Sequence, residues 1–320
     1  MKVPSRHRNK HLDIFYMYCL SVLIIFGLSV VPYIRSRNIS KHVPLLLGLE
    51  KKEEQPTPPP LFDPSAFADV NVVAKAYVVY DLTDKKVISS KNETTLLPLA
   101  SVSKLMMAIS AVTHKSLTDK ITLHPESIED GYDLGLSKGQ VWSLGELLKY
   151  TLVFSSNDGA QAIADSFGGD KVFIPQMNTD AKVLGLTTTF TDPAGRDLNG
   201  KIGGLGTALD VAKLFAIARK DIPELLDATS KSRVTVTASN GRISGIPNTN
   251  QDVQMLPGAE ASKTGFTDLA GGNLGVIVDI TVGHPVIIVV LGSTREARFT
   301  DVNKLYTALI KSVGATVKKD

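Results

Sequence analysis

Cysteine is almost absent from this 320-residue sequence. The single cysteine, Cys19, lies within an apolar run, which excludes an internal disulfide and a cysteine-based metal site. Histidine is also scarce, and the six histidines form no pair at metal-ligand spacing and no recognisable triad motif. We therefore expect neither a metal nor a cofactor.

The sequence also lacks a strong net charge, which is only +3. Residues 1–41 hold seven Lys or Arg and one acidic residue, a net charge of +6, which leaves −3 for the rest of the chain. The basic residues are thus concentrated at the N-terminus and do not predict a folded surface that binds a phosphate backbone. We exclude nucleic acid as a partner.

Long apolar runs are rare, and the exception is residues 14–34. These 21 residues carry no charge, and a helix needs about 20 to span a bilayer. A cleavable signal peptide is the alternative, since a basic start before an apolar run suits both. Because no Ala-x-Ala site follows and the run is long for a signal core, we favour an uncleaved membrane anchor. The basic residues before it favour a cytoplasmic N-terminus, so we expect the remainder on the extracytoplasmic face of the cell membrane.

Composition divides the chain into four parts. Residues 1–13 form a basic cytoplasmic tail and 14–34 the transmembrane anchor. Residues 35–69 include a charged stretch followed by prolines, which predicts an extended linker. The apolar patterning typical of a packed domain occupies residues 70–320.

The pattern in residues 70–320 predicts an α+β fold. Strand-like stretches lie near both ends of this domain, at 74–80, 86–90, 274–282 and 286–291, with helical patterns between them. A helix should begin near Ser101, a capping box at Ser143 and Glu146 should open another, and Asn240-Gly241 should turn a hairpin. We expect an antiparallel β-sheet flanked by helices, with a mostly helical subdomain, preceded by one transmembrane helix.

The first of three short motifs is Ser101-Val102-Ser103-Lys104, the only Ser-x-x-Lys in the chain. Positions i and i+3 share one helix face, so the amine of Lys104 can reach the Ser101 hydroxyl. A lysine can serve as a base only when it is neutral, which requires lowering its usual pKa of about 10.4 by burial or by a second cation. Apolar neighbours predict that Lys104 is partly buried, and Lys263 is the candidate cation. Taken alone, the motif fits a capping serine beside a surface lysine equally well.

The second and third motifs are Ser155-Ser156-Asn157 and Lys263-Thr264-Gly265. The Ser155 hydroxyl can relay a proton, and the Asn157 amide can hold a peptide group through both donor and acceptor. Lys263 and Thr264 can bind a carboxylate, and Gly265 allows a ligand close to the backbone. A helix cap followed by a turn, and an ordinary strand start, would explain the two motifs separately.

In this order, the three motifs resemble those of low-molecular-mass penicillin-binding proteins of the D-alanyl-D-alanine carboxypeptidase family. The resemblance extends from about Ala74 to the final helix and includes Pro193-Ala194-Gly195, Asn248-Thr249-Asn250 and KTGFTDLAGGNL from Lys263. It implies the fold shared by DD-peptidases and β-lactamases, with peptidoglycan stem peptides ending in D-Ala-D-Ala as substrate and β-lactams as inhibitors.

The resemblance also implies a role for each site residue. Ser101 would be the nucleophile, Lys104 its base, Ser155 the proton relay, Asn157 the substrate-aligning amide and Lys263 the stabilising cation. Thr264 with Arg298 would bind the substrate carboxylate, with Arg295 as the competitor for Arg298, and the N–H groups of Ser101 and Phe266 would form the oxyanion hole. The sequence departs from the family pattern at Leu99, usually proline; Ser103, usually threonine; Arg196, usually leucine; and Ala261-Ser262, usually glycine and an aliphatic residue.

Three other functions remain open. An endopeptidase that cuts peptidoglycan cross-links cannot be separated from a carboxypeptidase by these motifs. A class A β-lactamase needs a Glu-x-x-Leu-Asn loop between the second and third motifs, and none is present. An inactive envelope-binding protein is disfavoured because binding alone does not require two paired lysines.

Overall fold

Long strands rich in valine and isoleucine form the largest sheet of the protein. The computed structural model describes residues 61–128 and 133–317. Within this range, five antiparallel strands pair in the order β10-β11-β12-β1-β2. Their bounds are β1 Ala76–Asp81, β2 Lys86–Lys91, β10 Ala259–Thr267, β11 Gly271–Asp279 and β12 Pro285–Ser293. Strand β10 lies at an edge, so one side of its backbone is free of a neighbouring strand.

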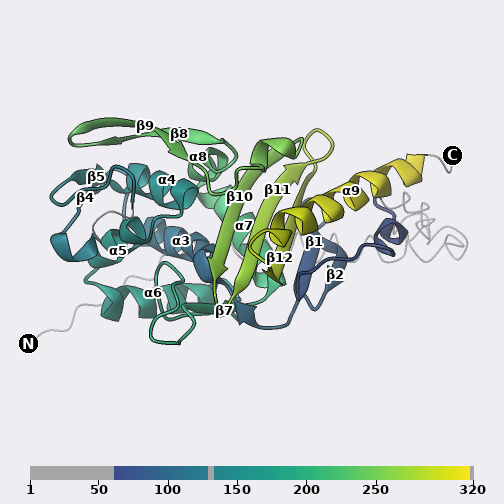
Figure 1. The fold of residues 1–320 in the computed structure, drawn as a ribbon, viewed down its shortest axis with the longest axis horizontal. Helices are drawn as coiled ribbons and strands as arrows, with labels where there is room; N and C mark the ends of the chain where they lie inside the picture. Colours follow the sequence, from purple (N-terminus) through teal and green to yellow (C-terminus); the bar gives the residue numbers. More distant parts are fainter. Residues whose placement is uncertain (1–60, 129–132, 318–320) are drawn as a thin grey trace, which may run out of the picture. The chain divides into compact units, whose positions relative to one another are not determined.

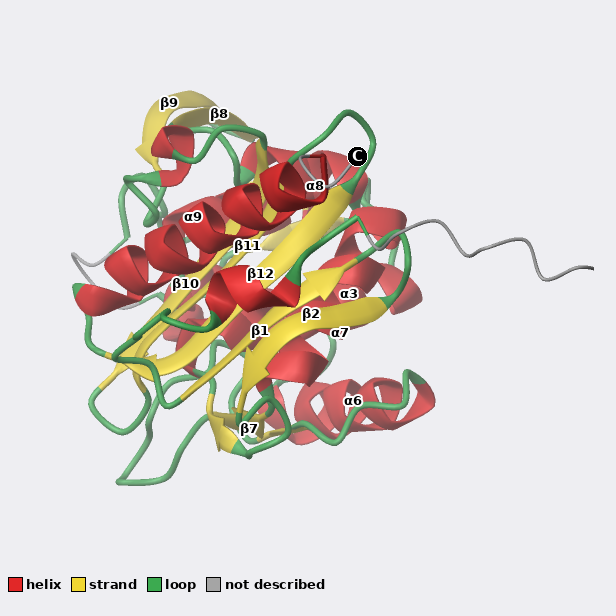
Figure 2. Cartoon of the chain, turned by 90° about the vertical axis from the view of Figure 1, so that its right-hand side faces the viewer, coloured by secondary structure: helices red, strands yellow, loops and turns green. Residues whose placement is uncertain are grey.

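Each face of this sheet is covered by a helix. Along β12, Ile287 and Val289 belong to one apolar cluster and Ile288 and Val290 to the other, as the two-residue period of a strand requires. Helix α7 (Ala208–Asp221) packs on the first face and α9 (Ala297–Val317) on the second, where Figure 2 shows α9 lying across the strands. Burying each such side chain contributes roughly 1.5–3 kcal/mol, so the sheet forms a stable support.

A second, mostly helical part adjoins the first face of the sheet (Figure 1). Its helices are α3 Lys104–His114, α4 Leu144–Phe154, α5 Asn157–Asp165, α6 Asp170–Val183 and α8 Pro223–Ala228. Two small sheets complete it: β3 Leu97–Pro98, β7 Gly204–Gly206 and β6 Thr189–Phe190; and β4 Lys120–Thr122, β5 Val141–Ser143, β8 Arg233–Ala238 and β9 Gly241–Pro247. The described residues also contain four 3₁₀ turns, η2 Pro64–Phe67, η3 Ala100–Ser103, η4 Pro125–Ser127 and η5 Val253–Met255. The predicted α+β architecture is confirmed.

Most local predictions hold, although several bounds differ: the strand expected at 274–282, for example, spans Gly271–Asp279. Ser143 caps α4 by accepting a hydrogen bond from the Glu146 N–H, and the hairpin after Asn240 is present. The helix expected from Ser101 begins at Lys104 instead, because residues 100–103 form the tighter η3 turn. The packed domain also begins before Val70, since Phe62 and Phe67 are already buried against α9. Two isolated aromatic residues among prolines produce no periodic signal, so their burial was not evident.

The predicted membrane anchor, residues 14–34, lies outside the described residues. Within the described ranges, no helix has both the length and the apolar character needed to cross a bilayer.

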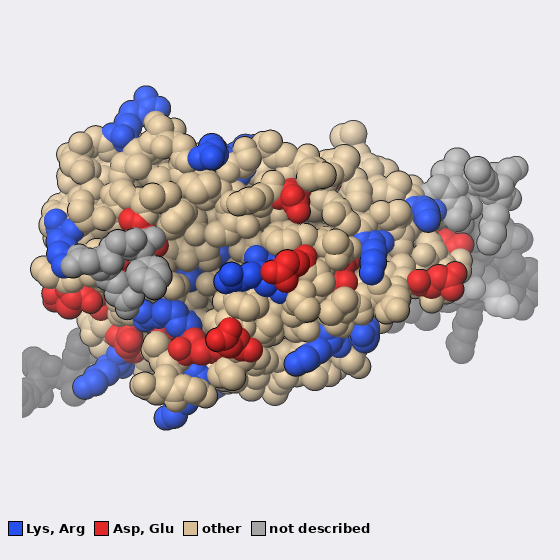
Figure 3. Space-filling model, viewed as in Figure 1, with Lys and Arg blue, Asp and Glu red and all other residues tan. Residues whose placement is uncertain are grey.

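On the face shown in Figure 3, Lys and Arg are interspersed with Asp and Glu rather than gathered in one basic patch.

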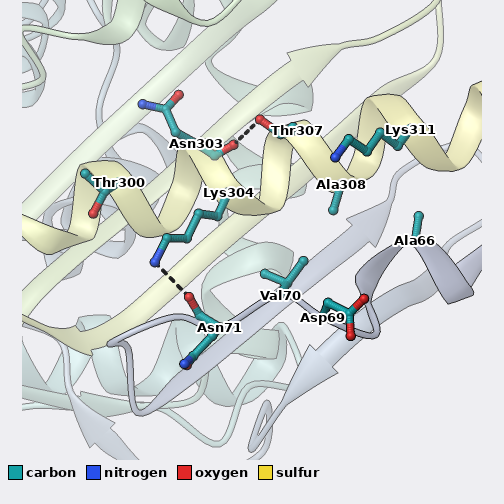
Figure 4. Close-up of a pocket in the computed structure, with 10 residues that line it drawn as sticks. All are labelled: Ala66, Asp69, Val70, Asn71, Thr300, Asn303, Lys304, Thr307, Ala308 and Lys311. Carbon is teal, nitrogen blue, oxygen red and sulfur yellow. Dashed lines mark hydrogen bonds between the residues drawn. The ribbon is translucent and has the colours of Figure 1, made fainter.

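A hollow of about 690 Å³ lies between α9 and the segment that leads into β1. Figure 4 shows its walls, with the Lys304 ammonium donating a 2.8 Å hydrogen bond to the carbonyl of Asn71. None of the residues that line it belongs to the three sequence motifs. This hollow is therefore separate from the place where the Ser101, Ser155 and Lys263 motifs meet.

Candidate active site

Ser101 lies in η3, a strained turn wedged between the large sheet and the helical part. Ala100, just before it, has a left-handed backbone with φ of 50°, which costs a residue other than glycine roughly 1–2 kcal/mol. Leu99 and Val102 hold the turn in place through their fully buried side chains. Gly195 packs so closely that a Cβ atom there would collide with the Ala100 carbonyl. The surrounding packing thus holds the Ser101 hydroxyl in one position.

Asn273 of β11 fastens this turn to the sheet. Its fully buried amide donates hydrogen bonds to the carbonyls of Pro98 (2.9 Å) and Leu99 (3.0 Å). Its Oδ1 accepts a 2.8 Å bond from the Gly292 N–H of β12. Gly265 of β10 faces the same turn, and a Cβ there would lie 3.2 Å from the Ser101 nitrogen. The turn is therefore held against β10 and β11 together.

Lys104, the first residue of α3, points its amine at Ser101. The Nζ lies 2.9 Å from Ser101 Oγ, 2.8 Å from Asn157 Oδ1 and 3.0 Å from the Ala194 carbonyl oxygen. The side chain is fully buried, and this burial lowers the pKa of Lys104 to about 7. A substantial fraction of Lys104 is then neutral near neutral pH, as a base requires.

The charges around Lys104 differ from those expected from the sequence. After burial, the largest influences on its pKa are Asp192, which raises it, Arg196, which lowers it, and Asp133, which raises it. The sequence pointed to Lys263 as the second cation, and the two lysines are indeed coupled, since the charge of Lys104 lowers the pKa of Lys263. The influence of a further cation, Arg196, on Lys104 was not expected. Sequence distance does not reveal which cation a fold brings close to a buried amine.

Ser155 and Asn157 occupy a break between two helices. Ser155 ends α4 in the left-handed conformation, with φ of 65°. Ser156 begins α5 by accepting a 2.7 Å hydrogen bond from the Gly159 N–H, and it donates a hydrogen bond to Asp133. Because Ser156 caps the helix, the Asn157 side chain is free of that task and contacts Lys104. A turn-forming role alone therefore does not explain Asn157.

Lys263 reaches the same break from β10. Its Nζ lies 2.8 Å from Ser155 Oγ and 2.9 Å from the Thr264 carbonyl oxygen. Burial lowers the pKa of Lys263 well below its usual value, and the charges of Lys104 and Arg298 lower it further. The Thr264 hydroxyl donates a 2.6 Å hydrogen bond to Thr249 Oγ1. Two buried lysines thus flank the cleft, each beside a serine hydroxyl.

Arg298 also reaches β10, as its spacing after the last strand suggested. It lies in the first turn of α9 and donates a 2.8 Å hydrogen bond to the carbonyl of Gly265. Burial, and then the charge of Arg295, lowers the pKa of Arg298 to about 10. Its competitor Arg295 lies over the Phe266 ring, 4.3 Å from the ring centroid. Arg298 thus contacts the Lys263-Thr264-Gly265 backbone, while Arg295 packs on the next side chain.

The structure adds residues to which the sequence analysis assigned no role. They are Asn273, Asp192, Thr249 and the carbonyl of Ala194. Thr249, Ala194 and Asn273 lay within stretches noted for their resemblance, but that resemblance did not show which atoms they present. For Asn273 a signal was available: an amide at the start of a strongly apolar predicted strand needs buried partners.

Comparisons with known proteins identify the family of this chain. A family model described as D-alanyl-D-alanine carboxypeptidase, peptidase family S11, matches residues 63–295. The chain belongs to this family. The family expected from the motifs, and the expected enzyme class, a serine-type D-Ala-D-Ala carboxypeptidase, are confirmed.

Curated relatives of this carboxypeptidase family carry two names. A D-alanyl-D-alanine carboxypeptidase of Mycobacterium tuberculosis is 30% identical over 205 residues, covering 62% of this chain and 67% of the relative. A D-alanyl-D-alanine endopeptidase of Escherichia coli is 30% identical over 245 residues, covering 74% and 77%. Identity alone does not separate the two activities.

A solved structure supports the fold of this carboxypeptidase-family chain. Penicillin-Binding Protein D2 from Listeria monocytogenes, in its cefotaxime-bound form, superposes with a TM-score of 0.65 and 31% identity. The match covers 75% of this chain and 98% of that protein. The similarity therefore includes nearly all of a protein that was crystallised with a β-lactam.

Replacing Asn273 with alanine should loosen the turn that carries Ser101. The change removes one hydrogen bond each from the Pro98 and Leu99 carbonyls and from the Gly292 N–H, and the Leu99 carbonyl keeps only the 3.3 Å bond from the Val102 N–H. Each hydrogen bond lost from a buried group costs about 1 kcal/mol or more. We expect the free energy of unfolding to fall by about 3 kcal/mol, and acylation to slow at temperatures where the variant is fully folded. Urea unfolding and the acylation rate measure the two effects.

Asn178→Ala is the matched control. Asn178 also makes three hydrogen bonds, one to Ile174 within α6 and two to Phe190 that tie α6 to β6. It should lower stability and leave the acylation rate of the folded protein unchanged. Equal slowing in both variants would contradict a specific role for Asn273.

Proposed function

We propose that this protein is a serine DD-peptidase that removes the terminal D-alanine from peptidoglycan stem peptides through an acyl-enzyme at Ser101. The observation that carries the proposal is the Lys104 amine, buried, with its pKa lowered to about 7, and 2.9 Å from Ser101 Oγ. A serine hydroxyl becomes a competent nucleophile when an adjacent neutral base accepts its proton.

Acylation then proceeds in two steps. Neutral Lys104 accepts the Ser101 proton as Oγ attacks the carbonyl carbon of the D-Ala–D-Ala bond. The tetrahedral intermediate collapses by breaking the C–N bond, and Ser155 passes the proton that Lys104 took to the leaving amine of D-alanine, so that Lys104 is neutral again. Lys263, hydrogen-bonded to Ser155 Oγ, holds that relay in place and stabilises developing negative charge. Asn157 holds the substrate amide beside Lys104.

The remaining site residues bind the substrate ends. The N–H groups of Ser101 and Phe266 form the oxyanion hole, and a single such donor contributes about 2.7–4 kcal/mol in a comparable acyl-transfer enzyme. Gly265, which packs on the nucleophile turn, lets the substrate lie close to β10. Thr264 and Arg298 bind the terminal carboxylate, with Arg298 also bracing the backbone through the Gly265 carbonyl.

Water then attacks the carbonyl carbon of the acyl-enzyme and loses a proton to neutral Lys104. The bond to Ser101 Oγ breaks, Lys104 returns the proton to Oγ, and the shortened peptide leaves. A β-lactam acylates the same hydroxyl, but its ring-opened leaving group stays attached and obstructs this water. Because the sequence lacks the glutamate loop by which a class A β-lactamase activates water, we infer slow deacylation and lasting penicillin binding. The cefotaxime-bound relative supports this part of the proposal.

Carboxypeptidase and endopeptidase activity are separated by substrate. The test is incubation of the full-length chain with a pentapeptide ending in D-Ala-D-Ala and, separately, with a cross-linked peptide dimer. Release of free D-alanine from the pentapeptide supports a carboxypeptidase. Cleavage of the dimer without release of D-alanine would identify an endopeptidase, the alternative that the Escherichia coli relative represents.

We also propose that the catalytic domain lies on the extracytoplasmic face of the cell membrane. Peptidoglycan lies outside the cytoplasmic membrane, so the substrate requires an extracytoplasmic domain, and residues 14–34 would anchor it. Carbonate-washed membranes from cells that produce the full-length chain should retain it. A variant with several of these apolar residues replaced by charged ones should no longer be retained.

The acylation rate should depend on pH through Lys104. The base is active only when deprotonated, so with a pKa of about 7 the rate should rise through neutral pH and level off above it. Below the pKa, the rate should fall about tenfold for each pH unit. The measurement is the rate of penicilloyl-adduct formation across pH; a rate independent of pH through this range would contradict Lys104 as the base.

A further inference from the structure

A buried carboxylate, Asp192, organises the turn that faces Lys104. Its side chain is 1% exposed. Asp192 Oδ1 accepts hydrogen bonds from the N–H groups of Ala194 and Arg196, both at 2.9 Å. The Ala194 carbonyl in turn accepts the 3.0 Å bond from Lys104 Nζ. Asp192 therefore shapes the wall against which the Lys104 amine packs.

The second oxygen of this carboxylate is occupied by Arg196. Asp192 Oδ2 accepts from the Arg196 guanidinium through Nε (3.1 Å) and Nη2 (2.8 Å). The same Nη2 lies 2.8 Å from Gln161 Oε1, one helical turn after Asn157 in α5. The guanidinium thus bridges the turn to the helix that carries Asn157. Leucine, the residue usual at this position, could do neither.

Charges face Lys104 from several elements. Asp192 and Arg196 come from the segment between β6 and β7, and Asp133 from the segment before β5. Lys263 of β10 is coupled to Lys104 across the cleft. The remaining neighbours of the amine, the Ser101 hydroxyl, the Asn157 amide and the Ala194 carbonyl, carry no charge. Two of these four charges are carboxylates that favour a protonated amine, and Arg196 is bonded directly to one of them.

We propose that Arg196 is a positioning residue that neutralises the buried Asp192 carboxylate and so keeps Lys104 in its neutral, proton-accepting form. The inference rests on the proposed function, in which Lys104 is the base for Ser101. Asp192 is needed to build the turn. Without a neighbouring cation, however, its negative charge would favour the protonated form of Lys104. The Arg196 guanidinium cancels that charge while leaving the Asp192 Oδ1 bonds to the turn intact.

Three variants separate charge from structure. Arg196→Leu leaves Asp192 unpaired and should raise the pKa of Lys104. Asp192→Asn keeps an oxygen for the turn and leaves Arg196 unpaired, so it should lower that pKa. The double variant removes both charges and should return it close to the native value. A residue that only supported the turn would produce no such opposite pair of shifts.

Two readouts apply to the full-length chain. The first is NMR titration of isotope-labelled lysine, with the Lys104 Cε signal assigned by its loss in Lys104→Met. The second is the pH dependence of penicilloyl-adduct formation. For Arg196→Leu we expect both midpoints to move up together, by about half a pH unit or more, with acylation below the midpoint slowed about threefold or more.

The outcomes distinguish the inference from the proposed function. Opposite shifts in the single variants, with return in the double variant, support the inference. An unmoved Lys104 titration in folded Arg196→Leu, or equal shifts in Arg196→Leu and the charge-preserving Arg196→Lys, would overturn it. A native protein that titrates as expected but forms no adduct, or whose rate ignores the shifts, would refute the proposed function and with it the positioning role.

Discussion

Replacing Ser101 with alanine should abolish D-alanine release and penicilloyl-adduct formation. Ser101 Oγ is the hydroxyl that lies 2.9 Å from the buried Lys104 amine, and the change removes the atom that forms the acyl bond. Loss of a nucleophile in a comparable serine enzyme lowers kcat by ~10⁶-fold, so we expect a loss of at least ~10⁴-fold. The measurement is D-alanine release from a D-Ala-D-Ala peptide, with adduct formation followed by intact mass.

Ser103→Ala is the matched control for this change. The Ser103 hydroxyl is fully buried against Gly204 and has no hydrogen-bond partner among the described residues. Its removal costs no hydrogen bond and should leave D-alanine release near the native rate. Two results would contradict Ser101 as the nucleophile. One is adduct formation by Ser101→Ala at the native rate, and the other is an equal loss of D-alanine release in both variants.

Replacing Lys104 with methionine should slow acylation by about 10²–10⁴-fold, the usual contribution of a positioned general base. Methionine has a similar length and suits a fully buried position, so the variant should fold, although Asn157 Oδ1 and the Ala194 carbonyl lose their donor. The measurement is the rate of penicilloyl-adduct formation, compared in native protein and variant at a pH above the Lys104 pKa.

Lys120→Met, in an exposed position on β4, is the matched control and should acylate at the native rate. Rapid acylation of the Lys104 variant would show that another group removes the Ser101 proton. The same result would also remove the basis for the expected pH dependence near neutrality.

The sequence predicted the chemistry of the site better than its geometry. Spacing placed Lys104 within reach of Ser101, and the helix break at residues 155–157 was evident from the loss of helical pattern. The structure then brings three segments separated by more than fifty residues each into hydrogen-bond distance. Spacing along one helix is determined locally, but the meeting of distant segments depends on the whole packed fold.

The interpretations that failed depended on tertiary contacts. Arg196, noted only as a departure from the family pattern, lowers the pKa of Lys104, because the turn after β6 packs on α3. The 3₁₀ turn at Ser101 replaces a helical start because Gly195 and Asn273 hold its backbone in place. Hydrophobic periodicity reports which face of an element is buried, and it contains no information on such side-chain-to-backbone contacts.

The most direct test of the central claim is to map the adduct after exposure of the full-length chain to benzylpenicillin. Trypsin should release residues 92–104, a peptide that contains both Ser101 and Ser103. We expect one lasting penicilloyl group per chain, assigned by fragmentation to Ser101 and absent from Ser101→Ala. Hydrolysed drug without a lasting adduct would instead indicate a β-lactamase, while intact drug and unmodified protein would indicate an inactive binding domain.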